Sequence, residues 1–459
     1  MESGATNNTP GRRPLVLIDR VLGARPGEFS AAAWSFTYFF CILGAYYMLR
    51  PVREAMAVQS GPETIPYLFA GTFAAMLVAT PIFGLVASRY PRRVFLPWVY
   101  YFFIINIMMF WYAFSSAVES GDSYIWLSRV FFVWISVFNL FVVSVFWSFM
   151  ADLYTHEQAR RLFGMIAAGG SVGAFLGGIV TSVLVSSIGF ENLFPFSAAL
   201  LVAAVFCISR LRRWVEQQKR DEVDTIGSGQ PLGGRSVSGI THVFRSKYFI
   251  AIATKSIIAS LLGTALYMFT AELVQQQIQT TDERTQFFSI VNNFTNGIAL
   301  VGQLLIVKHV VARFGIGVSL SLLPLVSIIG FALLAFEPTL AVVAILTVVR
   351  RSLGFAFGKP TSDMLYSVVT TEEKYKVKNF IDTVVYRAGD LVGTWSIRFL
   401  VSILGLAGTS IVMLPFAAIW VGIAIWLGRD YRRRDKAEDA VAYPATRHVR
   451  LALAARNPA

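Results

Sequence analysis

Residues 95–117 have the sequence FLPWVYYFFIINIMMFWYAFSSA, without one charged side chain. Residues 125–151, IWLSRVFFVWISVFNLFVVSVFWSFMA, are equally apolar apart from Arg129. An α-helix needs about 20 apolar residues to cross the hydrocarbon core of a bilayer, so each stretch is long enough. Neither has the alternation of a transmembrane β-strand, and only helices or closed barrels satisfy their backbone groups in lipid. The two stretches therefore predict an all-α integral membrane protein.

The composition of the whole chain supports this prediction. Of its 459 residues, 55% are hydrophobic and 15% are charged, whereas a soluble domain carries about 25% charged residues. The two cysteines, Cys41 and Cys207, both lie in apolar stretches. They provide neither a disulfide framework nor a zinc site, so we expect no cofactor.

Twelve apolar stretches can be separated along the chain, and one long break divides them into six and six. The break contains basic residues and a Gly/Ser-rich run, which is typical of a flexible linker. We predict an N-terminal segment at 1–31, six-helix bundles at 32–210 and 248–428, a linker at 211–247 and a basic tail at 429–459. The predicted spans are 32–50, 65–88, 95–117, 125–150, 163–188, 193–210, 248–273, 286–307, 316–336, 339–358, 379–403 and 407–428.

The fifth predicted span contains a run of glycines that places small residues on one face of the helix. These residues are Gly169, Gly170, Gly173, Gly177 and Gly178. Small residues let two membrane helices approach closely, so this face predicts tight helix packing.

Lysines and arginines are distributed unevenly between alternate loops. With the N-terminus inside, the inner segments hold roughly 31 of them and the outer loops about three. This bias predicts that both termini are cytoplasmic. The net charge of +13 is then a topology signal, and we expect no nucleic-acid partner.

Ionisable side chains within a span cost free energy, so each one indicates a function or a buried pair. Arg50, Arg53, Arg129 and Lys255 lie near span ends, where a long side chain can also reach the headgroups. The group on the eleventh span fits either a structural ion-pair cluster or a coupling and gating device. That group comprises Asp382, Tyr386, Arg387 and Asp390.

Residues 84–93, GLVASRYPRR, resemble the signature loop of major-facilitator transporters, from which Ser88 and Pro91 depart. The resemblance implies two six-helix halves that rock about a central site, with Arg89 and Arg92 in gating positions. In that arrangement spans one, four, seven and ten line the cavity, and each of them carries a cation here. A cationic, water-filled path attracts anions. The predicted substrate-binding residues are Arg50, Arg53, Glu54, Arg129, Lys255, Arg350 and Arg351.

Three segments resemble a more specific family, the ATP:ADP antiporters of plastids and intracellular bacteria. They are residues 46–54 (YYMLRPVRE), 146–163 (FWSFMADLYTHEQARRLF) and 360–389 (PTSDMLYSVVTTEEKYKVKNFIDTVVYRAG). The family has lysine and aspartate at the positions of Arg53 and Glu54, and usually lysine at that of Ser362. The resemblance implies the scaffold of a nucleotide exchanger with an altered substrate site.

We therefore predict a secondary transporter in the cytoplasmic membrane of a bacterium, exchanging an organic anion such as a nucleotide. Its partners would be the lipid bilayer, a small anionic solute and a coupling proton. Two alternatives stay open: a proton-coupled exporter of another small molecule, and a transport-fold receptor or assembly protein. An enzyme is not expected, because no histidine has a convincing catalytic partner.

Overall fold

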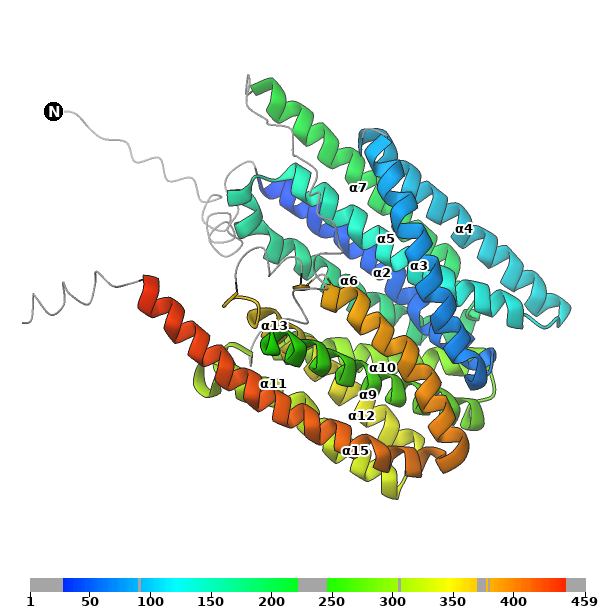
Figure 1. The fold of residues 1–459 in the computed structure, drawn as a ribbon. Helices are drawn as coiled ribbons and strands as arrows, with labels where there is room; N and C mark the ends of the chain where they lie inside the picture. The colour runs from blue at the N-terminus through cyan, green and yellow to red at the C-terminus, as the bar shows by residue number, and fades with distance from the viewer. Residues whose placement is uncertain are drawn as a thin grey trace, which may run out of the picture. The chain divides into compact units, whose positions relative to one another are not determined.

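The computed structural model describes residues 28–89, 92–221, 246–303, 307–369, 377–378 and 380–442. Within these ranges every regular element is a helix (Figure 1). Most of the predicted N-terminal segment and linker and the end of the basic tail lie outside the described residues. The α-helices are α2 (Phe29–Gln59), α3 (Ile65–Arg89), α4 (Arg92–Ser120), α5 (Ile125–Leu153), α6 (His156–Ile188), α7 (Leu193–Asp221), α9 (Lys247–Gln277), α10 (Thr281–Val301), α11 (Val307–Phe336), α12 (Leu340–Leu353), α13 (Lys359–Met364) and α15 (Tyr386–Ala442). The described residues also form a 3-10 turn, η1 (Pro62–Thr64), and the π-helical segments η3 (Gly354–Gly358) and η4 (Ile381–Val385), and residues 302–303 are π-helical as well.

Ten helices among the described residues are long and apolar enough to cross a membrane. They account for eleven predicted spans, because α15 comprises two helical stretches that meet at Gly405, where the backbone is not helical (φ 65°, ψ −173°), and these stretches cover 379–403 and 407–428. The remaining prediction, 286–307, lies on α10, which is not among the ten. Its polar residues, including Asn292, Asn293 and Asn296, lower its mean hydropathy. The all-α membrane fold class is confirmed.

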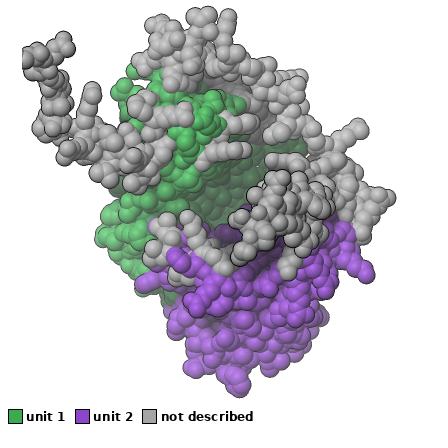
Figure 2. All heavy atoms as spheres, turned by 90° about the vertical axis from the view of Figure 1, so that its left-hand side faces the viewer, with its two compact units in different colours: residues 1–60, 74–231, 278–293 green, residues 61–73, 232–277, 294–459 purple. Residues whose placement is uncertain are grey.

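The chain forms two compact units (Figure 2). Unit 1 contains Met1–Ser60, Ala74–Pro231 and Ile278–Asn293, whereas unit 2 contains Gly61–Phe73, Leu232–Gln277 and Phe294–Ala459. Each unit therefore derives mainly from one half of the sequence and includes one short segment from the other half. The division at the linker into bundles 32–210 and 248–428 stays a prediction.

In unit 1, α2 packs against α5, α6 and α7. Its contact with α6 depends on glycines: a Cβ added to Gly169, Gly173 or Gly177 would lie 2.2 to 2.6 Å from carbonyl oxygens of α2. Real Cβ atoms essentially never come so close to another atom, so only glycine permits this backbone separation. The predicted small-residue face is confirmed.

Aromatic rings fill the rest of the unit 1 core. The ring of Phe114 on α4 lies 5.5 to 5.8 Å from those of Phe131, Phe190 and Phe194, measured between centroids. Edge-to-face and tilted pairs of this kind add stabilisation beyond the area they bury. A buried polar contact of this region joins two phenols, with Tyr38 Oη donating to Tyr100 Oη at 2.6 Å.

The start of α6 shows how local sequence fixes a helix end. The side chain of Thr155 accepts from the backbone N–H of Gln158, and the Gln158 side chain in turn accepts from the backbone N–H of Thr155. This capping box satisfies two backbone donors that the helix leaves unpaired. Gln158 and Arg161 also donate to the buried carboxylate of Glu28, which ties α6 to the residue preceding α2.

In unit 2, α15 packs against α9 and α11, and α12 contacts the same two helices. The π-helical segments interrupt two of the long helical paths: η3 separates α12 from α13, and η4 precedes α15. π-helical turns in long helices occur frequently at functional sites. The segments η3 and η4 are therefore positions in unit 2 at which a functional site is expected.

Candidate functional site

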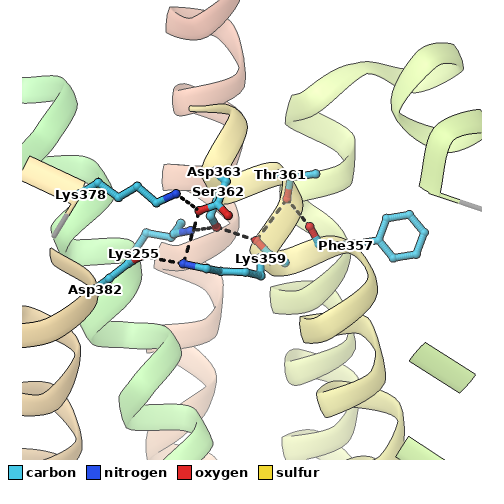
Figure 3. A network of polar contacts seen from close by, with 9 residues as sticks. Lys255, Phe357, Lys359, Thr361, Ser362, Asp363, Lys378 and Asp382 are labelled. Atoms are coloured by element: carbon cyan, nitrogen blue, oxygen red, sulfur yellow. Dashed lines mark hydrogen bonds and ion pairs between the residues drawn. The ribbon is translucent and has the colours of Figure 1, made fainter. Parts of the chain in front are cut away.

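A group of lysines and aspartates lies beside the π-helical segments η3 and η4 of unit 2 (Figure 3). We call it the lysine cluster. It contains Lys255 of α9, three residues of α13, one residue between α13 and η4, and one residue of η4. Its members are Lys255, Lys359, Ser362, Asp363, Lys378 and Asp382.

Ion pairs join the half-exposed members of the lysine cluster. Lys359 Nζ lies 2.6 Å from Asp382 Oδ2 and 3.4 Å from Asp363 Oδ1. Lys378 Nζ lies 3.0 Å from the same oxygen of Asp363. Two carboxylates therefore hold two ammonium groups, and the pair between Lys359 and Asp382 connects α13 with η4.

Lys255 differs from the other two lysines in burial and in its partner. Its side chain is buried, with 7% of the residue exposed, and its Nζ donates to Ser362 Oγ. The Ser362 hydroxyl donates in turn to the carbonyl oxygen of Gly358 at 2.6 Å. Among the described residues no carboxylate lies within ion-pair distance of Lys255; those of Asp382 and Asp363 act on it from farther away. A buried ammonium group therefore faces a neutral partner.

Tyr366 lies against the lysine cluster, with Lys378 Nζ 6.0 Å from the centre of its ring. Burial raises the pKa of the Tyr366 hydroxyl, and the nearby carboxylates of Asp382 and Asp363 raise it further. The phenol therefore stays neutral and leaves the charge balance of the lysine cluster unchanged.

The charge balance of the lysine cluster favours an anion. Three ammonium groups stand against two carboxylates, and burial of one cation away from water is costly unless a negative group approaches it. An ammonium group has three N–H donors and binds phosphate or carboxylate oxygens as a point charge. The arrangement can therefore bind a small anion carrying several oxygens.

The sequence analysis identified Lys255 and Asp382 but missed Lys359 and Asp363 as site residues, and it assigned Lys378 to topology. Lys359 and Asp363 follow the predicted end of the tenth span at 358, where charged residues are usual. The helix in fact continues through η3 into α13. One feature of the sequence could have indicated this site. The segment Gly354–Gly358 begins and ends with glycine and is followed directly by a lysine. Glycines in the interior of a helix often have a packing or functional reason.

Arg350 and Arg351 lie on α12, away from the ion pairs of the lysine cluster. Arg350 is buried, and its guanidinium donates to Ser327 Oγ at 3.2 Å and to the carbonyl oxygen of Ala259 at 2.7 Å. It therefore links α12 to α11 and α9. Arg351 is half-buried. Their predicted roles in substrate binding stay predictions.

The predicted group on the eleventh span divides between two places. Asp382 belongs to the lysine cluster, whereas Asp390 meets α9, with Oδ1 2.5 Å from Ser260 Oγ. Arg387 Nη1 lies 3.8 Å from Asp390 Oδ2, which is a loose ion pair within one helix. The backbone carbonyl oxygen of Tyr386 lies 3.3 Å from the same serine hydroxyl.

In unit 1 the predicted cations lie against aromatic rings. The guanidinium of Arg53 stacks 4.2 Å from the centre of the Phe132 ring and forms an ion pair with the buried carboxylate of Glu54 at 3.2 Å. Arg50 donates to Tyr47 Oη at 3.0 Å. Arg129 lies 4.8 Å from the centre of the ring of Trp126, which is exposed.

Two further predicted residues are located only by their backbone. Arg89 ends α3 and Arg92 begins α4. Their side chains lie outside the described residues, so their gating role stays a prediction.

Most of the membrane region matches one known group of proteins. Residues 34–394 match the Major Facilitator Superfamily. The chain belongs to this superfamily. The resemblance seen in the loop at residues 84–93 is therefore confirmed, and the protein is a membrane transporter of the secondary class.

Curated relatives extend the resemblance seen in three segments to most of the chain. ADP,ATP carrier protein 2 of Chlamydia pneumoniae is 21% identical over 506 residues, covering 90% of this chain and 91% of the carrier. ADP,ATP carrier protein 1 of Chlamydia trachomatis serovar D is 22% identical over 459 residues, covering 85% and 86%. The predicted similarity to this family is confirmed, and the low sequence identity makes this chain a divergent relative.

Solved structures agree on the fold. The nucleoside transporter NupG superposes with a TM-score of 0.57 at 17% identity, covering 88% of this chain and 98% of NupG. A bacterial homologue of the iron transporter ferroportin, in an inward-facing state, gives a TM-score of 0.58 at 12% identity, covering 88% and 98%. Proteins with different substrates thus share this architecture, so the substrate must be argued from the site.

Proposed function

We propose that this transporter exchanges organic anions of the nucleotide class by alternating access across the cytoplasmic membrane of a bacterium. The observation that carries the proposal is Lys255, a buried cation whose direct partner is the neutral hydroxyl of Ser362. Lys359 and Lys378 lie in the same cluster and add two more cations. Phosphate oxygens would supply the negative charge that Lys255 lacks at close range.

The names of the relatives support the nucleotide class. Two of them are ADP,ATP carriers that align with most of this chain. Arg53 and Glu54 of unit 1 provide a second charged group, in which the arginine stacks on Phe132. Aromatic and guanidinium planes suit flat rings and charged oxygens, so this group is a separate candidate for solute binding.

The excess of Lys and Arg in alternate loops supports a topology with both termini in the cytoplasm. In that orientation α13 and the start of η4 lie toward the cytoplasmic ends of their spans. A solute that enters from the cytoplasm would then meet the half-exposed Lys359 before the buried Lys255.

A second candidate function is proton-coupled transport, and the environment of Asp390 favours it. This carboxylate is mostly buried, within hydrogen-bonding distance of Ser260 and 3.8 Å from Arg387 Nη1. A carboxyl group in such a place can take up and release a proton as its surroundings change. Proton-driven uptake into vesicles without internal nucleotide would favour this candidate over exchange.

The test is counter-exchange by the full chain in proteoliposomes preloaded with unlabelled ADP, with labelled ATP, ADP or orthophosphate outside. We expect saturable ATP uptake that requires internal ADP. Lys255→Gln should lower uptake at least about tenfold, because a close charge pair in a binding site is worth well over 1 kcal/mol. Lys247→Gln is the matched control, since Lys247 is exposed at the start of the same helix.

Two results would overturn the proposal. One is the absence of uptake of all three anions by wild-type protein that is folded and inserted. The other is wild-type exchange by the Lys255→Gln variant, which would remove the lysine cluster from the substrate path.

A further inference from the structure

The carboxylates of Asp363 and Asp382 occupy the lysines that the proposed anion would use. Lys359 Nζ is 2.6 Å from Asp382 and 3.4 Å from Asp363, and Lys378 Nζ is 3.0 Å from Asp363. An ammonium group has three N–H donors. With two acids beside it, the charge of Lys359 is already balanced before an anion arrives, so a phosphate must compete with carboxylates for this lysine.

The paired lysine and aspartates of the lysine cluster are more exposed than the members of a buried structural ion pair. The side chains of Lys359, Asp363 and Asp382 are 56%, 38% and 41% exposed, so a solute and water can reach them. Lys255, by contrast, is buried and has no acid in ion-pair contact among the described residues. The lysine cluster thus has one cation that is not occupied by an acid and two that are.

We infer that Asp363 and Asp382 are built-in competitors of the transported anion, which weaken its binding so that it can be released. The inference rests on the proposed function. Lys255 anchors the anion, while Lys359 and Lys378 move from carboxylate to anion when it binds and return when it leaves. A site with three unopposed lysines would hold a polyanion too tightly to release it quickly, because affinity differences act mainly on dissociation rates.

The position of the competing pair suits this exchange of partners. Lys359 directly follows the π-helical segment η3, and Asp382 lies within η4. Both residues therefore stand at irregular points of their helices, where the backbone can adjust more easily than within a regular α-helix. The same pair connects α13 to η4, so anion binding would release one segment from the other.

A purely structural role for the acids predicts the opposite change in affinity. If Asp382 and Asp363 only hold the site together, neutralising either one should disorder the lysines and weaken anion binding. If they compete with the anion, neutralisation should strengthen binding and slow release. The direction of the affinity change therefore separates the two roles.

The experiment measures equilibrium binding of labelled ATP to the purified full chain, together with KM and maximal rate in ADP-loaded proteoliposomes. For Asp382→Asn we expect ATP to bind between about twofold and fivefold more tightly, which corresponds to removing one half-exposed ion pair. KM should fall by a similar factor, and the maximal exchange rate should fall because release is slower. Asp363→Asn, which frees two lysines, should give the same signs.

Two comparisons test the specificity of this result. Asp430→Asn is the matched control, because Asp430 pairs with Arg434 within α15 and not with the lysine cluster. It should leave ATP affinity unchanged. In the double variant Lys359→Gln/Asp382→Asn, the gain in ATP affinity seen in Asp382→Asn should disappear, because the lysine for which Asp382 competes is no longer present.

Weaker or unchanged ATP binding in folded Asp382→Asn and Asp363→Asn proteins, with wild-type binding intact, would overturn the inference and leave the proposed function standing. Failure of the wild-type protein to bind ATP, ADP or orthophosphate would overturn both. The unfolding temperature of each variant is measured first. If one aspartate variant does not fold, the other decides the sign.

Discussion

The two units use charge in different ways. In unit 1 the described helices contain no π-helical segment, the core is rich in aromatic rings, and Arg53 stacks on Phe132 within that setting. In unit 2 the π-helical segments η3 and η4 interrupt the long helices, and charged side chains pair across the interruptions. A cation against a ring needs no change of partner, whereas a lysine between two carboxylates can exchange one oxygen for another. The charged residues of unit 1 are thus held against rings, whereas those of unit 2 can exchange partners.

The largest expected effect is the loss of stability when the close packing of α6 on α2 is disturbed. This change tests how rigid unit 1 is. Gly173→Ala should destabilise the protein by about 3 kcal/mol, because the added Cβ would lie 2.2 Å from the carbonyl oxygen of Phe40. Gly164 lies on the same helix with open space around it, so Gly164→Ala should be neutral. Thermal unfolding in detergent measures both. Equal unfolding temperatures would mean that the helices separate at little cost, and the contrast between the units would fail.

Arg350 provides the corresponding test in unit 2. Arg350→Gln should lower stability by about 1–3 kcal/mol, because it removes charge-assisted hydrogen bonds to Ser327 and Ala259. Transport should fall together with stability. The measurements are thermal unfolding and counter-exchange on the same preparation. Lost exchange with an unchanged unfolding temperature would instead make Arg350 a residue that contacts the solute directly.

The smallest expected effect concerns pH and the segment of α10 that belongs to unit 1. Asp282 accepts a hydrogen bond from the backbone N–H of Phe190 at 2.9 Å, and burial raises the pKa of its carboxyl group. Burial likewise raises the pKa of Glu191, and the charge of Asp282 adds to the rise. Folded protein then holds these protons more tightly than unfolded protein, so stability falls as pH rises through the raised pKa values.

Asp282→Asn should therefore flatten the dependence of the unfolding temperature on pH between about 4 and 8, and raise stability slightly at neutral pH. The asparagine carbonyl oxygen can still accept from Phe190. Asp122→Asn serves as the control, because Asp122 is exposed, and its profile should match that of the wild-type protein. An Asp282→Asn profile as steep as the wild-type one would show that Asp282 does not set the pH dependence.

Prediction from sequence succeeded wherever a property belongs to a single helix. The apolar stretch at 95–117 became the long helix α4, and the glycines of the fifth span became the contact with α2. The predicted boundary between the last two spans agrees with the structure, because the backbone of Gly405 is not helical and separates two helical stretches of α15. The span predicted at 286–307 is less clear, because α10 is more polar than the helices that are apolar enough to cross a membrane.

The candidate site was only partly predictable. Lys255 and Asp382 were identified because ionisable residues within spans are costly and therefore rare. Lys359 was missed because it follows the predicted end of a span, and Arg350 proved to donate to neighbouring helices. Neither the burial of Lys255 nor the choice of its partner could be read from the spacing of charges.

The sequence by itself determined that the chain is a bundle of membrane helices of the major-facilitator kind, because hydropathy, charge bias and motifs are local properties. Only the tertiary structure decided which charges meet. Lys255 reaches Ser362 across 107 positions, and Lys359 reaches Asp382 across 23. Those contacts depend on how each helix is rotated and on where π-helical turns shift its side chains. Rotation and turn type are set by packing between helices, which no single stretch of sequence specifies.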